Sequence, residues 1–415
     1  MPPADSLFSP ALLGPVQLRN RIVRAGTGES MATPSGSIGD DYVKLHEDLA
    51  RGGVGLALTG HVYCHVRGRY GSLQAGLDSD DKIPGFAKVT RAVHRQGGRI
   101  FAQIAHAGSQ SMSFDTRPLA PSAVDNVMTG RRVEAATPDE IDEVIAAFAA
   151  AARRAMEAGF DGIHLHGANG YLISEFRSPL TNTRDDEWGG TQERRDRFAV
   201  EVIRAIRAEL PATAGFTMKV GLADLVDEPG GLAVPEAVEG VARFVDAGLD
   251  GVEVSSNLMS DYVSASIRGY VAVDSKRALQ DLLLHRLHRQ AEPEAYFLPF
   301  ARAVRRQVDT SILLVGGMRR IETLRRVIAD GDADFISMAR PFIREPDLVL
   351  RLESGASTSP ACVSCNICLM HDEHHPLRCW RTPRRRLAAH AIYRLRGGFK
   401  GKGTGRKPQA TQPDR

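Results

Sequence analysis

Short apolar runs alternate with amphipathic stretches eight times along the chain. The runs are rich in β-branched residues and are typical of buried strands, whereas the stretches between them carry apolar residues at helical spacing. The expected strands are 22–25, 55–59, 100–104, 162–166, 217–220, 251–255, 312–315 and 335–338. The expected helices are 41–51, 87–96, 138–157, 193–209, 235–246, 296–306, 321–329 and 346–353.

Boundary residues support these assignments. Thr137, Pro138 and Glu140 form a capping arrangement at the start of one helix, and Gly159, Gly248 and Gly331 each follow a last helical turn. Eight strand–helix units with apolar strands predict an α/β fold, a closed (β/α)8 TIM barrel with helices outside. An open, doubly wound sheet is the alternative, but no GxGxxG motif follows the first strand.

Composition adds few restrictions. The 415 residues are 43% hydrophobic and 25% charged, as in ordinary globular proteins. No run of 18 apolar residues predicts a membrane span, and the N-terminus lacks the pattern of a secretory signal, so we expect a cytoplasmic protein.

The net charge of +3 is unevenly distributed. Residues 381–415 hold 11 Lys and Arg against one acidic residue, so the body before them is mildly acidic. Within this tail, 384–396 is expected to form a basic helix and the rest to be disordered. We interpret it as a solvated tail; docking on nucleic acid, a membrane or a partner protein is the alternative.

Polar residues gather after the fourth strand. His164 and His166 share one face of that strand by alternation, and Asn169 and Tyr171 follow in the loop. In a barrel this loop lies at the catalytic end. Histidine and asparagine donors beside a phenol suit a site that holds a developing oxyanion while tyrosine supplies a proton. The alternative is a hydrogen-bonded core histidine followed by an Asn-Gly turn.

Four of the five cysteines lie close together near the C-terminus. Cys362, Cys365 and Cys368 follow a C-x2-C-x2-C spacing, and Cys379 comes after ten further residues. This crowding, in a chain without an export signal, points to metal chemistry rather than disulfides. A 4Fe–4S cluster, a zinc ion and free thiols are the three interpretations of these residues. Cys64 stands apart and is expected to be buried.

Several motifs resemble the Old Yellow Enzyme family of FMN-dependent NAD(P)H oxidoreductases. They are NRIVRAGTGE near the start, FAQIAHAG at the third strand, HGANGYLISEF with SPLTNTRDDEWGG after the fourth, and LLVGGM with ISMARPFIREPD after the last two. The resemblance runs in order from Phe8 to Cys379. It implies an FMN ene-reductase that takes hydride from NAD(P)H and reduces the C=C bond of an activated, enone-type alkene.

The resemblance also implies roles for individual residues. His166 and Asn169 match the pair that grips the substrate oxygen, and Tyr171 matches the proton donor. Gln103 matches a residue at the flavin ring edge, and Lys219 the basic residue beside the pyrimidine end. The other residues implied around the cofactor are Ala25, Gly26, Thr27 and Gly60 after the first two strands, and the phosphate cradle Gly316, Gly317, Ala339 and Arg340.

Three departures from the family pattern stand out. Gly28 occupies the position where relatives carry a Thr or Cys that tunes the flavin, with Thr27 as a substitute, and Ser109 stands where relatives often have Arg. The cysteine pattern is similar to that of the branch with trimethylamine dehydrogenase and 2,4-dienoyl-CoA reductase. Those relatives carry a C-terminal FAD/NAD-binding part, where this chain has its basic tail.

The sequence thus predicts three segments: an FMN barrel over 1–357, a cysteine-rich extension over 358–380 and a tail over 381–415. The expected partner is a small electron-poor alkene. An amine dehydrogenase or demethylase that sends electrons through an iron–sulfur cluster to a partner protein is the alternative function. Nucleic acid is not expected as a ligand, and a homo-oligomer is compatible with the sequence.

Overall fold

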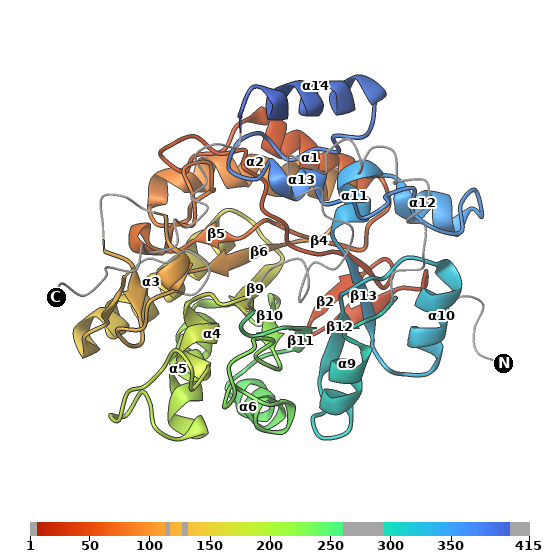
Figure 1. Ribbon diagram of the computed structural model, residues 1–415. Helices are drawn as coiled ribbons and strands as arrows, with labels where there is room; N and C mark the ends of the chain where they lie inside the picture. The colour runs from red at the N-terminus through yellow and green to blue at the C-terminus, as the bar shows by residue number, and fades with distance from the viewer. Residues whose placement is uncertain (1–5, 113–116, 127–131, 260–293, 399–415) are drawn as a thin grey trace.

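A closed ring of eight parallel strands forms the centre of the computed structural model, which describes residues 6–112, 117–126, 132–259 and 294–398 (Figure 1). The ring confirms the predicted (β/α)8 barrel. Its strands are β3 (Ile22–Arg24), β4 (Leu56–Leu58), β6 (Ile100–Ala105), β9 (Gly162–Gly167), β10 (Gly215–Gly221), β11 (Gly251–Ser255), β12 (Ser311–Leu314) and β13 (Phe335–Met338).

Neighbouring strands pair in chain order, and two pairings close the ring. β13 pairs with β3, and β4 pairs directly with the start of β6, while the short strand β5 (Val62–Tyr63) pairs with the end of β6. The register of β9 sets His166 opposite Lys219 of β10. On its other side β9 sets His164 opposite Gln103 of β6. The carboxyl ends of all the strands therefore meet at one mouth.

Helices surround the ring, as the amphipathic pattern predicts. They are α1 (Asp40–Arg51), α2 (Ile83–Arg95), α3 (Pro138–Glu157), α5 (Gln192–Glu209), α6 (Val234–Asp246), α9 (Leu298–Arg305), α10 (Ile321–Ala329) and α12 (Leu348–Glu353). The expected capping box is present in α3, where Thr137 and Glu140 bond each other's backbone N–H groups. Helix α2 begins four residues earlier than expected, with Pro84 in its first turn.

Two short helices at the barrel mouth were not predicted from the sequence pattern. They are α4 (Leu172–Arg177), which follows the β9 loop, and α11 (Arg340–Arg344), which follows β13. Both are shorter than the window over which helical periodicity can be recognised. Both begin directly at the barrel mouth, so each one fixes a residue at its start in the site.

The inside of the barrel changes from apolar to polar along its axis. A hairpin of β1 (Ala11–Leu13) and β2 (Val16–Leu18) closes the amino-terminal end and packs against inward-facing side chains of the ring, among them Leu313, Phe101 and Phe335. Two residues further along β6, on the same face, lies Gln103, and two residues beyond Phe335 lies Ser337. Polar side chains thus occupy the end where the strands finish.

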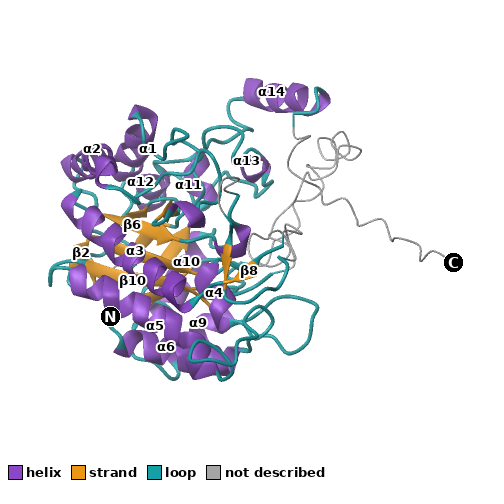
Figure 2. Cartoon of the chain, turned by 90° about the vertical axis from the view of Figure 1, so that its left-hand side faces the viewer, coloured by secondary structure: helices purple, strands orange, loops and turns teal. Residues whose placement is uncertain are grey.

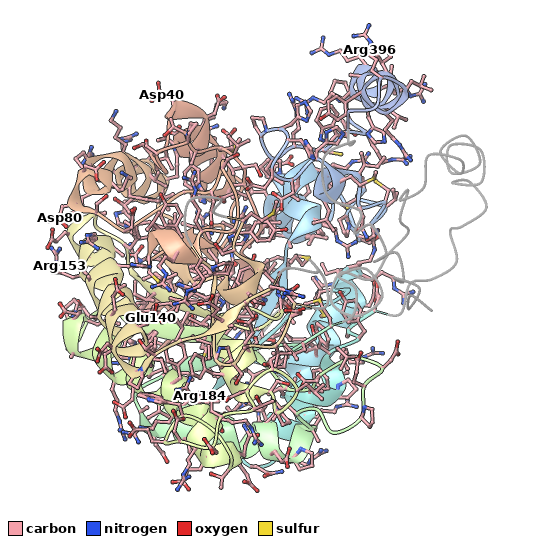
Figure 3. The ribbon with its side chains drawn as sticks, turned by 60° about the vertical axis from the view of Figure 1, so that its left-hand side comes forward. Asp40, Asp80, Glu140, Arg153, Arg184 and Arg396 are labelled. Carbon is pink, nitrogen blue, oxygen red and sulfur yellow. The ribbon has the colours of Figure 1, made fainter. Side chains whose placement is uncertain are left out.

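The cysteine-rich segment covers one side of the mouth. It contains α13 (Ile367–Met370) and is followed by the basic helix α14 (Arg384–Leu395), which lies outermost in Figures 1 and 2. In Figure 3, Arg396 points away from the barrel at the end of that helix. The segment is tied to the β3 loop: the Leu377 N–H donates to the Glu29 carbonyl at 2.9 Å, and the Ser30 hydroxyl donates to Asp372 at 2.6 Å.

The part of the tail that is expected to be disordered lies almost wholly outside the described residues, since the description ends at 398. Among the helices that the structure describes, none is long and apolar enough to cross a membrane.

Candidate active site

A cavity of about 320 Å³ opens at the carboxyl end of the barrel. Its walls come from residues in the last part of β6, β10 and β11, from residues at or just after the ends of β3, β9, β12 and β13, and from the cysteine-rich segment. Tyr171, His166 and Asn169 all line it. So do all the residues predicted to contact the cofactor except Gly60, namely Ala25, Gly26, Thr27, Gln103, Lys219, Gly316, Gly317, Ala339 and Arg340. Gly60 lies behind this wall, where a side chain would meet the Thr27 carbonyl.

The β9 loop holds the three predicted catalytic side chains together. His166 is the last residue but one of β9, and its ring centroid lies 4.7 Å from that of Tyr171. Asn169 adopts a left-handed backbone conformation (φ 63°), which turns the chain sharply between them. The Ser255 hydroxyl of β11 donates to Asn169 Oδ1 at 3.2 Å, so the amide has a fixed orientation. Backbone bonds from Asn169 and Gly170 to the β11 loop fix the turn itself.

Histidine 166 is neutral in this environment. Burial lowers the pKa of His166 well below its usual range, and the nearby His61 and Lys219 act in the same direction. Its Nδ1 has no hydrogen-bond partner among the described residues. A neutral imidazole with an unsatisfied buried nitrogen is suited to bind a polar ligand atom in the cavity.

The residues at the centre of the cavity fit a flavin ring. Gln103 is buried, and its Nε2 donor has no partner among the residues that the structure describes. A Cβ at Gly26 would lie 2.3 Å from the Gln103 Oε1, so only glycine leaves room for that amide. An unpaired amide donor in a mostly apolar cavity matches the edge of a planar ring that carries acceptors.

The opposite end of the cavity fits a phosphate. Gly316 (φ 107°) and Gly317 (φ 73°) follow β12 in conformations that favour glycine, so their backbone can approach a ligand closely. Arg340 lines the same end and also contacts Asn366 of the cysteine-rich segment. Backbone groups after the last two strands together with a guanidinium are the elements of a phosphate site in this fold.

Lys219 reaches the cavity with a partner. Its ammonium group contacts the buried carboxylate of Glu253 on β11, and the His164 Nε2 lies 3.5 Å from that carboxylate. Burial raises the pKa of Glu253, but the charge of Lys219 and the contact with His164 outweigh it and hold the pKa well below its usual range. Glu253 is therefore a carboxylate, and the Lys219 ammonium group contacts it rather than facing the cavity alone.

The predicted flavin-tuning position has an unexpected neighbour. Gly28 lines the cavity beside Asp372, whose Oδ1 would lie 2.9 Å from a Cβ at that position. The Thr27 hydroxyl bonds the Ala25 carbonyl at 3.1 Å. A carboxylate from the cysteine-rich segment thus stands where the family pattern places a hydroxyl or a thiol.

The four clustered cysteines line one small hollow next to this cavity. Cys362, Cys365, Cys368 and Cys379 surround it, and Cys368 also lines the main cavity. Ser364 and Asn366 adopt left-handed conformations that wrap the backbone around the hollow. Burial raises the pKa of Cys368 to about 12. The predicted location of Cys64 is confirmed, since it is buried away from this hollow.

These thiols do not form a compact metal centre. Within residues 6–112, 117–126, 132–259 and 294–398, no three His, Cys, Asp or Glu side chains converge closely enough to hold one metal ion. A zinc ion would draw four sulfurs to about 2.3 Å from a single point. A cubane cluster binds each thiolate at a different iron, so its ligands lie further apart.

Behind the β9 loop lies a buried carboxyl group. Glu175 of α4 accepts hydrogen bonds from the backbone N–H of Ser109 at 3.1 Å and from the Ser109 hydroxyl. Burial raises the pKa of Glu175 to about 8, and the two bonds from Ser109 only partly oppose this. By the resemblance given above, Ser109 stands at a position where relatives often have Arg, and here its hydroxyl contacts Glu175.

Sequence reasoning missed several residues of the cavity. His61 follows β4, at a strand end that the barrel prediction marks for inspection, but nothing in its spacing assigns it a role. Tyr70, Tyr296 and Phe297 come from loops without a recognisable motif. Asp372 reaches the site because the cysteine-rich segment folds back over the mouth, which periodicity cannot predict.

Comparison with known proteins identifies the family of the chain. Residues 6–359 match the model of the NADH:flavin oxidoreductase / NADH oxidase family. The 4,4'-dithiodibutanoate disulfide reductase of Rhodococcus erythropolis is 34% identical over 383 residues, which cover 88% of this chain and 93% of that protein. The chain therefore belongs to this family, and it is an oxidoreductase that uses FMN with a nicotinamide cofactor.

Two solved structures are similar across most of the chain. The Old Yellow Enzyme homologue of Zymomonas mobilis has a TM-score of 0.69 and 25% identity, with 90% of this chain and 99% of that chain covered. The histamine dehydrogenase of Rhizobium sp. 4-9 has a TM-score of 0.76 and 26% identity, with 92% and 53% covered. The chain thus spans about half the length of the second protein. The predicted resemblance is confirmed.

The carboxyl group of Glu175 predicts a pH dependence of stability. Its folded-state pKa of about 8 exceeds the ordinary value of 4.5, so its stabilising effect is complete below pH 4.5 and is lost as the pH rises to about 8. We expect Glu175→Gln to remove this loss, which amounts to roughly 4–5 kcal/mol at most. Denaturant unfolding at pH 5 and pH 8.5 measures it, with the exposed Glu209→Gln as control. Equal pH dependence in wild type and Glu175→Gln would contradict the assignment.

Proposed function

We propose that this chain reduces the C=C bond of electron-poor alkenes, with hydride from NAD(P)H and a proton from Tyr171. The observation that carries the proposal is the grouping of His166, at the end of β9, with Asn169 and Tyr171 on the short loop that follows, all facing the cavity. The neighbouring Gln103, Gly316 and Arg340 are the residues that would hold FMN. Bound FMN supplies the hydride acceptor and donor that links the nicotinamide to the alkene.

His166 and Asn169 would bind the oxygen of the activating group. Hydride addition to an enone moves negative charge onto that oxygen, and donors already in place there stabilise the charge without reorganising. The low pKa of His166 keeps its imidazole neutral, so the ring acts as a hydrogen-bond donor rather than as an acid. The bond from Ser255 to Asn169 Oδ1 orients that amide.

Tyr171 would protonate the α-carbon. Its ring is held between His166 and His61, with centroid distances of 4.7 and 5.6 Å, and the side chain is almost fully buried. A buried phenol fixed in this way can deliver a proton to one face of a bound alkene.

Amine dehydrogenation is the second candidate function. The likeness to histamine dehydrogenase and the clustered cysteines support it. Oxidation of an amine does not place negative charge on a substrate oxygen, so this reaction has no use for His166 and Asn169 as paired hydrogen-bond donors.

We also propose that Cys362, Cys365, Cys368 and Cys379 hold a 4Fe–4S cluster. The four thiols surround one hollow, with Arg340 and Arg381 in its wall. Backbone N–H groups of Ser364 and Ile367 interact with the sulfurs of Cys362 and Cys365. Positive charge and N–H groups around sulfur stabilise the thiolates of such a cluster. Because Cys368 lines both the main cavity and the cysteine hollow, electrons could pass between the cluster and FMN over a short distance.

Replacing Tyr171 by Phe should slow alkene reduction about 100- to 10,000-fold, because only this half-reaction needs the phenolic proton. Reduction of bound FMN by NAD(P)H should be nearly unchanged. Stopped-flow spectroscopy of the two half-reactions measures both, with Tyr393→Phe on α14 as a matched control. Equal losses in the two half-reactions would assign Tyr171 to flavin or nicotinamide binding instead.

Replacing His166 or Asn169 by Ala should each weaken the binding of phenolate ligands roughly 10- to 100-fold, because each loses one hydrogen bond to a charged oxygen. Titration of the charge-transfer absorbance between bound FMN and the phenolate gives the affinity. His94→Ala, a histidine on the outer helix α2, should bind as the wild type does. Unchanged affinity in both cavity variants would show that the oxyanion site lies elsewhere.

Protein purified anaerobically with iron supplied should contain about four iron and four sulfide per chain. Cys365→Ser should lose both and keep FMN, because the FMN contacts come from the barrel strands. Alkene reduction with NAD(P)H should persist, and one-electron transfer to an artificial acceptor should be lost. Cys64→Ala is the matched control and should retain the metal. Wild-type protein without iron and without sulfide would refute the cluster.

A further inference from the structure

His61 stands between the phenol of Tyr171 and the side chain of Gln74. Its Nε2 lies 3.5 Å from the Tyr171 Oη, and its Nδ1 lies 2.7 Å from the Gln74 Nε2. His61 follows β4 and lines the main cavity. Gln74 is buried behind it in the loop that leads towards α2. The imidazole thus connects the proposed proton donor with a polar group of the interior.

The orientation of the Gln74 amide is fixed by two groups whose roles are unambiguous. Its Oε1 accepts from the backbone N–H of Tyr70 at 2.6 Å, and a backbone N–H can only donate. Its Nε2 donates to the backbone carbonyl of His61 at 2.9 Å, and a carbonyl can only accept. The amide nitrogen is therefore the end that faces the imidazole.

This orientation determines the tautomer of His61. Because the Gln74 Nε2 is a donor, the His61 Nδ1 must accept, and the proton of a neutral imidazole lies on Nε2. Burial lowers the pKa of His61, against the opposing effect of Asp372 and Glu29, so the ring is neutral near pH 7. The Nε2–H group is then directed at the Tyr171 oxygen.

We propose that His61 is a positioning residue for proton transfer: its Nε2–H donates to the Tyr171 Oη and stabilises the phenolate left when the phenol gives up its proton. Gln74 sets the tautomer that makes this possible. The inference rests on the proposed alkene reduction. In that step the Tyr171 O–H bond breaks and a C–H bond forms at the α-carbon. The electron pair of the O–H bond stays on the Tyr171 oxygen, and water returns the proton afterwards.

The arrangement differs from one in which a charged histidine assists. A neutral donor strengthens its bond as negative charge grows on the phenol oxygen, which lowers the pKa of the phenol. It adds no positive charge beside His166, whose ring centroid is 6.4 Å from that of His61.

The first test is the pKa of Tyr171 in the FMN-bound enzyme, measured by ultraviolet difference titration against Tyr171→Phe. His61→Phe keeps a planar ring but has no N–H group, and it should raise the pKa of Tyr171 by about 1 unit or more. His61→Gln retains an amide donor, so the pKa of Tyr171 in this variant should lie between those in the wild type and in His61→Phe. An identical Tyr171 pKa in wild type and in both variants, each with full FMN content, would overturn the proposal. This measurement needs no alkene.

The second test compares two substrates. Enone reduction needs the proton of Tyr171, whereas hydride addition to a nitroalkene leaves a nitronate that can dissociate without protonation at carbon. His61→Phe should slow oxidation of reduced FMN by the enone about 10-fold or more. The nitroalkene reaction should stay within about twofold of wild type. Equal slowing of both substrates would mean that His61 acts on binding and would overturn the proposal.

A double variant separates this inference from the proposed function. In the Tyr171→Phe background, His61→Phe should cause no further loss with the enone, because it acts through the phenol. A second loss of the same size would overturn the positioning role. If the wild type reduces neither substrate, the proposed function fails, and the tyrosine titration alone decides whether His61 bonds Tyr171.

Discussion

Closure of the parallel strand ring is the constraint on which the site depends. The pairings of β13 with β3 and of β4 with β6 leave no open edge in the barrel. All strands then end at one mouth, and the two-residue alternation continues each inward-facing row from apolar to polar side chains. On β6 the change from apolar to polar occurs between Phe101 and Gln103, which are two residues apart on the same face of the strand. A slip of one residue in β6 would turn Gln103 outward and remove the amide from the cavity.

Much of this arrangement could be predicted from the sequence, for reasons that particular residues make clear. His166 was recognisable because a buried strand places it at a predictable end. Lys219 was found only through the family resemblance, and the register brings the two residues opposite each other. Gly26 and Gly316 were found through motifs that resemble a family, and the structure supplies the physical reason, since space or backbone conformation requires glycine there.

Other features depend on contacts between distant segments, which periodicity does not encode. His61 lies at a strand end, yet its orientation depends on Gln74 and the backbone of Tyr70. Asp372 enters the cavity only because Ser30 and the β3 loop hold the cysteine-rich segment against the barrel. The pairing of Lys219 with Glu253 also went unpredicted, since a carboxylate in the middle of β11 resembles any other strand residue until the barrel closes.

The main cavity and the cysteine hollow share a wall, and this has a consequence for the energetics of binding. Arg340 lines the phosphate end of the main cavity and the cysteine hollow, and its guanidinium holds Asn366 between two of the cysteines. Any ligand that orders this loop changes the freedom of Arg340, and any ligand that binds Arg340 changes the freedom of the loop. The two binding free energies are therefore linked, and thermodynamic reciprocity makes the effect equal in both directions. A ligand in the cysteine hollow would therefore shift the affinity at the phosphate end by the part that Arg340 contributes, while the barrel contacts hold the rest.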